Sequence, residues 1–377
     1  MADRESSYPE AFIEEIKLPE EKKTPAEKPE VSDIDKKQAE EAREKRIEED
    51  KLLSRMDQLT SALYGAKLME GGPEEAEQVA EELARLRELK EAKLCEPPCE
   101  PVEKMGDDHK GINQSYILRL GEKGEMKGIF KPVDGEKVLG EKSELSPRPG
   151  IEPKSSFKRE WLAFMADRAL GLDVTPPTVL RREAQGVGSF QAWIPDAKTY
   201  NEGGPDAALS EEEARKIALF DYLIGSQDRH GGNFMIDKGG KAHAIDNGLS
   251  FGRGLTYEIF GQKERFPTLA VRSEPLEMFN KEKLKGKAFD PTLPESVEKS
   301  LRDFLQSGKT KETLHECFKI LGEDAEVIWQ HFTARVEEMV TTGKLPDNYD
   351  ETKAQQDIES AFNNAAYLFP ETAEKAA

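Results

Sequence analysis

The segment SQDRHGGNFMIDKGGKAHAIDNG, residues 226–248, constrains the fold of this chain more than any other. It places Asp228 and Asn233 five positions apart in a polar loop that contains two glycines. The runs NFMID and AHAID on either side of KGGK predict a short β-hairpin. Because a hairpin returns the chain to its starting point, we expect Asp246, at the end of the second strand, to lie near Asp228 and Asn233.

Each of these three side chains also has a purely structural interpretation. Asp and Asn are common turn formers, and an acidic residue can simply end a strand. That interpretation explains each residue alone. It does not explain why three oxygen-bearing side chains cluster around one hairpin that follows an apolar helix. We therefore interpret the segment as a functional site.

The chemistry that fits this cluster is phosphoryl transfer. That reaction needs a carboxylate beside the acceptor hydroxyl, oxygen ligands for magnesium and a cation on the phosphates. A loop that supplies Asp228 and Asn233, with Asp246 returned to the same place, meets the first two needs. The spacing D-x-x-x-x-N is also that of the catalytic loop of protein kinases.

The cation is predicted on an upstream hairpin, in which SYILRL and MKGIFKP flank the turn GEKGE. Lys131 ends the second strand, where its ammonium can reach phosphate oxygens, although an exposed strand-end lysine is the simpler alternative. Glu160 lies on the next helix, in FKREWLAF. If Trp161 and Phe164 face the sheet, Glu160 lies at the edge of that face and is the best candidate to pair with Lys131.

The turn before this hairpin, DHKGINQSY, is a further candidate for phosphate contacts. It is not a P-loop, because the chain contains no G-x-x-x-x-G-K-[ST] motif. Its backbone N–H groups and side-chain donors are nevertheless suited to phosphate. The candidate residues are Gly111, Asn113, Gln114 and Ser115.

Residues 1–105 are predicted to form an N-terminal extension that is helical and partly disordered. The stretch KLPEEKKTPAEKPEVSD is rich in Pro and charge and has too little apolar surface to fold. Two helices follow, and the second carries an apolar stripe at three- and four-residue steps: Val79, Leu83, Leu86 and Leu89. Two interpretations stay open, a helical hairpin packed on the next domain and an arm that binds a protein partner.

From about residue 106 onward, the pattern predicts strands first and helices later, which indicates an α+β fold. We expect two lobes, residues 106–197 and residues 198–377. PPTVLRRE and VGSFQAWI predict further strands, and the Pro pair before the first suggests an edge strand. Ser210 and Glu213 form a capping box before the helix EEARKIALFDYLIG.

The composition restricts the classes of partner that we expect the chain to bind and the compartment in which we expect it. The net charge of −20 argues against generic binding to nucleic acid or to an anionic membrane. No apolar run approaches the roughly 20 residues of a membrane span, and the polar start MADRESSYPEAF lacks the core of a signal peptide. Three cysteines, Cys95, Cys99 and Cys317, do not make a disulfide scaffold. We expect a cytoplasmic protein, or one that is translocated later without a classical signal peptide.

The motifs DRHGGN, AIDNG, GIFKP and KGINQSY resemble those of the phosphatidylinositol 3-/4-kinase-like branch of the kinase superfamily. HipA-type and Fam20-type protein kinases are more distant relatives with a similar layout. The resemblance covers about residues 108–275. It departs from the pattern in the metal motif, which is Asp246-Asn247-Gly248 in place of DFG, and in the approach GSQDRH to the catalytic loop. These forms are closer to bacterial and type II members.

The resemblance implies a bilobal kinase fold with ATP and Mg²⁺ in the cleft. By matching motif positions it implies that Lys131 binds phosphate, that Glu160 anchors Lys131 and that Asp228 is the catalytic acid or base. Asn233 and Asp246 would be the magnesium ligands. The same resemblance assigns His230 to support of the catalytic loop or of the transferring phosphate, and it places the adenine-binding hinge at Gln191, Trp193 and their neighbours.

The acceptor is not fixed by these motifs, because lipid, protein and small-molecule kinases share the fold. We favour a protein Ser/Thr hydroxyl over an inositol lipid, since the acidic chain has no basic amphipathic helix or lipidation signal. A nucleotide-binding pseudokinase scaffold and a kinase fold that transfers AMP also remain open. The basic residues after the metal motif are candidates for acceptor binding: Arg253, Lys263, Arg265 and Arg272.

Overall fold

The computed structural model describes residues 33–94, 103–105, 113–136, 151–203, 209–252, 256–259, 262–265, 271–279 and 289–346. The chain divides into two compact units, Met1–Glu48 and Glu49–Ala377, and the boundary falls inside the first helix. Every feature discussed below belongs to the second unit. The predictions for Gly111, for Arg253 and for the stretch before residue 33 lie outside the described residues, as do Cys95, Cys99 and the side chains of Lys263 and Arg265.

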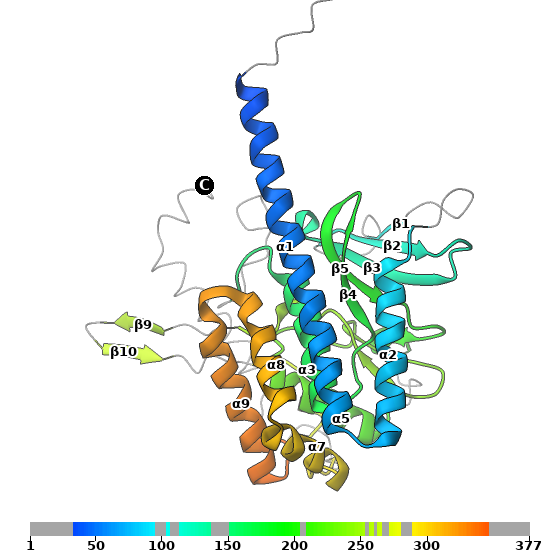
Figure 1. The fold of residues 1–377 in the computed structure, drawn as a ribbon. Coiled ribbons are helices and arrows are strands. Elements are labelled where there is room, and N and C mark those ends of the chain that lie inside the picture. The colour runs from blue at the N-terminus through cyan, green and yellow to red at the C-terminus, as the bar shows by residue number, and fades with distance from the viewer. Residues whose placement is uncertain are drawn as a thin grey trace, which may run out of the picture. The chain divides into compact units, whose positions relative to one another are not determined.

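The helices and strands follow one another in the order drawn in Figure 1. The helices and 3₁₀ turns are α1 (Asp33–Glu70), α2 (Pro73–Glu91), η1 (Val133–Gly135), α3 (Ser156–Leu170), α4 (Tyr200–Gly203), α5 (Glu211–Ile224), η3 (Asn247–Leu249), α6 (Glu274–Glu277), α7 (Glu295–Gln306), α8 (Lys309–Phe318), η4 (Lys319–Asp324) and α9 (Ala325–Thr342). The strands are β1 (Glu103–Met105), β2 (Ser115–Leu120), β3 (Met126–Pro132), β4 (Thr178–Glu183), β5 (Gly186–Ala192), β6 (Lys198–Thr199), β7 (Phe234–Ile236), β8 (Ala242–Ala244), β9 (Thr256–Ile259) and β10 (Gln262–Arg265).

A five-stranded antiparallel sheet has the order β1-β2-β3-β5-β4. It contains the predicted hairpin β2–β3, and β4 lies at its edge, as the preceding Pro pair indicates. A second antiparallel sheet, β6-β7-β8, contains the predicted hairpin of the DRHGGN segment. The fold is therefore α+β, as predicted.

The pleat of the large sheet sends Lys131 and its apolar neighbours to opposite faces. Phe130 is directly opposite Phe190 on β5, and both side chains are fully buried. Lys131 is opposite Ser189, and Gln191 follows two positions later on β5. Since side chains alternate along a strand, Lys131 and Gln191 emerge on the same face, away from Phe130.

Helix α2 packs on the large sheet, and α1 from Glu49 onward contacts α3 and Arg182 of β4. The predicted stripe on α2 is buried at Val79, Leu86 and Leu89, in one core with Phe130. Arg181 of β4 donates hydrogen bonds to the last carbonyl groups of α2 and to Ala92, 2.6 Å away. From Glu49 onward the prediction of a helical hairpin packed on the next domain is therefore confirmed.

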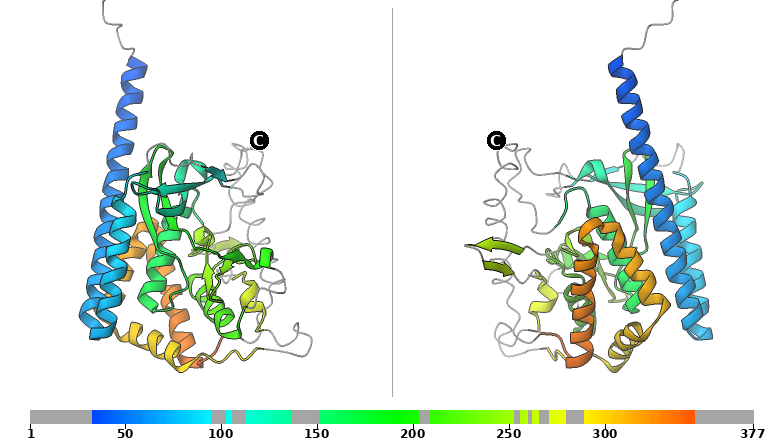
Figure 2. Two further views of the ribbon diagram at one scale, coloured as in Figure 1. Left: turned by 90° about the vertical axis from the view of Figure 1, so that its right-hand side faces the viewer. Right: turned by 60° about the vertical axis from the view of Figure 1, so that its left-hand side comes forward.

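Helix α3 is the central element of the second unit. Thirteen of its fifteen residues are buried, and it contacts β4, β5, α5, α7 and α8. It ends at Gly171 in the left-handed conformation (φ 68°), which glycine adopts without steric cost. Figure 2 shows the large sheet towards the top and α7 at the bottom. Within the described ranges, none of the helices combines the length and apolar character that a bilayer crossing requires.

Candidate active site

Lys131 joins two of the predicted site residues. Its Nζ lies 2.5 Å from Oε1 of Glu160 on α3 and 2.9 Å from Oδ1 of Asp246 after β8. The Glu160 side chain is only 3% exposed, whereas that of Asp246 is 53% exposed. The lysine is therefore anchored on its buried side by one carboxylate and meets the other at the surface.

Charge interactions among Lys131, Glu160 and Asp246 keep the Lys131 amine protonated and the Asp246 carboxylate ionised. Burial disfavours the Lys131 ammonium, but Asp246 and Glu160 outweigh this effect and raise the pKa of Lys131. Lys131 in turn lowers the pKa of Asp246, against an opposing effect of burial, with smaller contributions from Arg229 and His230. At neutral pH the site thus presents a protonated amine beside an ionised carboxylate.

The backbone at Asp246 has an unusual conformation. Its φ of 55° and ψ of 56° lie in the left-handed region, which non-glycine residues seldom adopt. The next residue, Asn247, donates its backbone N–H to Oε2 of Glu160 at 3.0 Å. One oxygen of Glu160 therefore binds Lys131, and the other binds the backbone of Asn247, directly after Asp246. A single buried carboxylate holds both Lys131 and the loop that contains Asp246.

The catalytic-loop residues are held by short local hydrogen bonds. Nδ2 of Asn233 donates to the carbonyl oxygen of Asp228 at 2.8 Å, and the backbone N–H of Gly232 donates to Nδ1 of His230 at 3.0 Å. His230 thus accepts a hydrogen bond from within its own loop. Ile245 donates its backbone N–H to the carbonyl oxygen of Asn233 at 3.0 Å, which joins the loop to the strand that delivers Asp246.

Arg272 forms an ion pair with Asp228, with Nη1 2.8 Å from Oδ1. Both side chains are partly exposed, 25% for the arginine and 22% for the aspartate. The Arg272 backbone is fixed as well, because its N–H donates to Ser226 and its carbonyl accepts from Arg229. Of the basic residues expected to meet the acceptor, Arg272 is the one whose side chain the described residues place at the catalytic loop.

Two buried residues of the site were not predicted. Arg229, the middle residue of DRH, and Asp221 of α5 are both fully buried and form an ion pair at 2.8 Å. Asp221 also accepts a 2.6 Å hydrogen bond from the hydroxyl of Ser273. The sequence carried one signal for this pair, namely an acidic residue within the apolar run IALFDYLIG.

The remaining predicted nucleotide contacts lie along β2 and β5. Gln191 is buried on the Lys131 face and donates to Oγ1 of Thr178 at 3.2 Å. Asn113 and Gln114 are exposed just before Ser115 begins β2, and the N–H of Gln114 is bound by Gly135 at 2.9 Å. That N–H is therefore already committed within the protein, which leaves the side chain of Gln114 as its available donor group.

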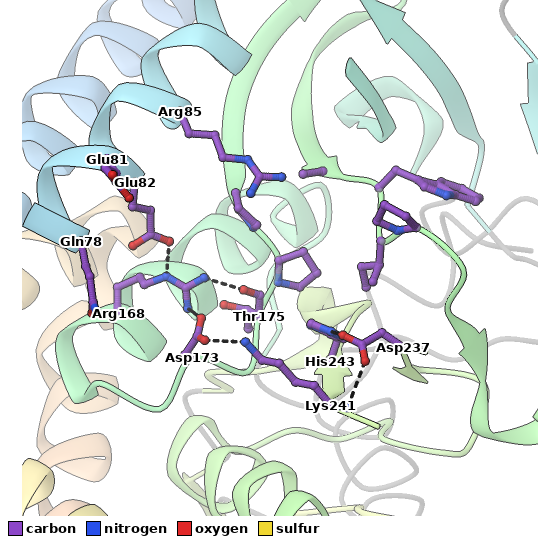
Figure 3. Close-up of a pocket in the computed structure, with 16 residues that line it drawn as sticks. Gln78, Glu81, Glu82, Arg85, Arg168, Asp173, Thr175, Asp237, Lys241 and His243 are labelled. Atoms are coloured by element: carbon purple, nitrogen blue, oxygen red, sulfur yellow. Dashed lines mark hydrogen bonds and ion pairs between the residues drawn. The ribbon is translucent and has the colours of Figure 1, made fainter. Parts of the chain in front are cut away.

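Trp193, predicted to border the adenine, lies beside Lys127. The ammonium of Lys127 lies 3.7 Å from the centroid of the Trp193 ring. Trp193 also lines a cavity of about 500 Å³ between α2, the end of α3 and the β7–β8 hairpin (Figure 3). A row of charges, Glu82, Arg168, Asp173 and Lys241, crosses this cavity. Of the predicted site residues, Trp193 lines this cavity, whereas Lys131 and residues 226–233 do not.

The donor set fits magnesium. Because Nδ2 of Asn233 is committed to Asp228, its Oδ1 is left for a cation, and Asp246 adds an exposed carboxylate. Mg²⁺ is commonly held by one or two such oxygens together with substrate phosphates. Over the described part of the chain, no group of three or more His, Cys, Asp or Glu side chains could hold a metal ion. The metal would therefore depend on the nucleotide for its remaining ligands.

Comparison with known proteins agrees with this geometry. Residues 211–340 match the family model of phosphatidylinositol 3- and 4-kinases. Protein Rv2133c of Mycobacterium tuberculosis is 23% identical over 155 residues, which span 32% of this chain and 52% of that protein. Phosphatidylinositol 4-kinase gamma 4 of rice (Oryza sativa subsp. japonica) is 26% identical over 166 residues, 37% of this chain and 29% of the relative. Its Arabidopsis thaliana namesake is 23% identical over 159 residues, 34% of this chain and 28% of the relative.

The chain thus spans about half the length, or less, of these curated relatives. The family match includes the catalytic loop, the metal loop and Arg272, and it begins after the strands that carry Lys131. Residues 211–340 therefore resemble the phosphatidylinositol 3- and 4-kinases, as the motifs predicted, and indicate a kinase-type domain.

Proposed function

We propose that this chain is an ATP-dependent, Mg²⁺-requiring kinase that transfers the γ-phosphoryl group to a hydroxyl. The observation that carries the proposal is the contact of Lys131 with Glu160 and Asp246, at 2.5 and 2.9 Å. It brings a strand-end lysine, a buried helical carboxylate and a metal-loop carboxylate from three distant segments to one point. Phosphoryl transfer is the chemistry that requires this combination.

In this proposal each residue has one task. Lys131 binds phosphate oxygens while Glu160 keeps its ammonium in place. Asp228 receives the proton of the acceptor hydroxyl, and Arg272 holds its carboxylate in one orientation. Asn233 and Asp246 hold magnesium, which when bound neutralises charge on the phosphates.

The same contacts suggest how the two proposed lobes meet. Lys131 belongs to residues 106–197, and Asp246 belongs to residues 198–377. We propose that these ranges are the two lobes of a kinase fold, with ATP bound between them and Gln191 at the adenine side. From Glu49 onward the extension contacts both proposed lobes, since Glu49 binds Arg182 and Glu70 accepts from Thr310.

For the acceptor we favour a protein Ser/Thr hydroxyl. The net charge of −20 opposes residence at an anionic membrane, where an inositol lipid would be met. An inositol lipid is the second candidate, and the names of the two plant relatives favour it. Arg272 is compatible with both, because a guanidinium binds carboxylates and phosphates equally well.

One experiment tests the function and sorts the acceptors. The protein is incubated with γ-labelled ATP and Mg²⁺, with a phosphoinositide panel in one reaction and a cell lysate in another. Asp228→Ala is the control, because it is assigned to the acceptor and not to the nucleotide. Label in protein or in lipid identifies the class of acceptor. Label from α-labelled ATP would indicate AMP transfer, and binding of ATP without turnover would indicate a pseudokinase scaffold.

A further inference from the structure

The fully buried Arg229 contacts both loops that carry the proposed magnesium ligands. Nη1 donates to the carbonyl oxygen of Asn233 at 2.5 Å and also to the carbonyl oxygen of Ile245. Nη2 donates to Oδ1 of Asn247. Ile245 and Asn247 flank Asp246 on either side. One guanidinium therefore binds the backbone of the first proposed ligand and both neighbours of the second.

Arg229 is itself fixed from behind. Its Nε donates to the buried Oδ1 of Asp221 at 2.8 Å, and Oδ2 of Asp221 accepts from Ser273. The backbone N–H of Arg229 donates to Arg272 at 3.0 Å, and its carbonyl accepts from Glu274 at 2.9 Å. The side chain therefore cannot shift without breaking its contacts to α5, to Asn233 and to the two neighbours of Asp246.

We propose that Arg229 is a positioning residue that sets the distance between the two magnesium ligands, Asn233 and Asp246. The inference rests on the proposed function, since it assumes that these residues bind the metal. Its physical basis is the shape of the group: a planar guanidinium offers five donors in a fixed fork, so all its acceptors keep a fixed spacing. The left-handed backbone at Asp246 needs such support, because an unfavourable conformation persists only where its surroundings enforce it.

The test compares Arg229→Lys with the wild-type protein. Lysine keeps the charge opposite Asp221, but it offers one nitrogen and cannot reach all the acceptors together. Mn²⁺ is titrated by electron paramagnetic resonance in the presence of a non-hydrolysable ATP analogue, and binding of the same analogue is measured without metal. We expect the variant to bind Mn²⁺ about 10- to 100-fold more weakly while its metal-free nucleotide affinity changes less than about twofold.

Arg335→Lys is the matched control. Arg335 is also a buried arginine, 7% exposed, and donates to the carbonyl oxygen of Tyr222 at 2.5 Å, near the end of α5. It contacts neither metal-bearing loop in the described part of the chain. This variant should lower the thermal midpoint and leave Mn²⁺ affinity unchanged, which separates a loss of stability from a loss of ligand spacing.

A second variant keeps the proposal testable if Arg229→Lys does not fold. Asn247→Ala removes one acceptor of Arg229 and leaves the pair with Asp221, and we expect Mn²⁺ binding about three- to tenfold weaker. Wild-type Mn²⁺ affinity in a folded Arg229→Lys or Asn247→Ala protein would overturn the positioning role alone. If the wild-type protein binds neither the analogue nor Mn²⁺, the proposed function fails and this inference falls with it.

Discussion

Removal of the Glu160 carboxylate should reveal how much of the site depends on one buried side chain. Its two oxygens bind the Lys131 ammonium at 2.5 Å and the backbone N–H of Asn247 at 3.0 Å. Glu160→Ala forfeits a charged hydrogen bond, worth about 1.5–3 kcal/mol, and leaves a buried N–H without a partner, which costs about 1–3 kcal/mol. We therefore expect a loss of about 2.5–6 kcal/mol in the free energy of unfolding.

Glu160→Gln is the informative companion because its amide oxygen can still accept a hydrogen bond. This substitution should cost the difference between a charged and a neutral hydrogen bond, about 1–2 kcal/mol of unfolding free energy. That cost corresponds to a factor of about 5 to 30 in the ratio of folded to unfolded protein. Urea unfolding of the three proteins measures these differences, and isothermal titration with ATP and Mg²⁺ measures the effect on nucleotide binding. If the two variants lose equal stability, or if both lose less than about 0.5 kcal/mol, the carboxylate does not anchor Lys131 in the way described here.

Three further predictions concern the loops and the extension. Asp228→Ala should abolish phosphoryl transfer with ATP affinity within about twofold of wild type, and near-normal turnover would remove Asp228 from the mechanism. Lys131 lowers the pKa of Asp246, so this pair should stabilise the fold above the ordinary aspartate pKa of about 3.9 and lose its effect as the pH falls through the lowered pKa. The difference in unfolding free energy between wild type and Asp246→Asn should therefore shrink in acid. A constant difference from pH 2 to 7 would contradict the pairing. Deletion of residues 1–48 should leave the thermal midpoint within about 2 °C of wild type. Deletion of residues 1–104 should prevent folding, because α1 and α2 contribute buried residues to the same hydrophobic core as the large sheet. A stable protein from the second deletion would refute this dependence.

Local patterns carried most of the fold. The alternation in residues 115–132 and the helix cap at Ser210 each depend on residues close together in sequence, and both predictions are confirmed. The other half of the capping box is not formed, because the side chain of Glu213 accepts hydrogen bonds from Ala242 and Lys216 instead. The apolar stripe on α2 could also be predicted, but the surface against which it packs could not. A stripe shows which face of a helix is buried and does not show against what, so the packed hairpin was favoured and the partner-binding arm stayed open until the sheet was seen.

The candidate site likewise has one part that local sequence predicts and one part that depends on the fold. The loop and hairpin that contain Asp228 and Asp246 could be predicted, since one short segment holds them all. The burial of Arg229 could not, because its partners lie 8 residues before it, at Asp221, and 18 after it, at Asn247. An arginine beside an aspartate in a polar loop has the pattern of a solvent-exposed cation. Only the fold supplies the buried carboxylate and carbonyl groups that make its burial favourable.

The contacts of Arg181 and Arg182 on β4 have a consequence for how the protein behaves in solution. β4 is the last strand of the large sheet, and an open strand edge is a template for pairing with another chain. Arg181 binds the end of α2, and Arg182 binds Glu49 and Asp50 at 2.8 Å or less, so charged side chains and two helices cover this strand. The N-terminal helices therefore guard against self-association, and an opening that separates them from β4 in the folded protein would be expected to promote pairing of this strand with another chain.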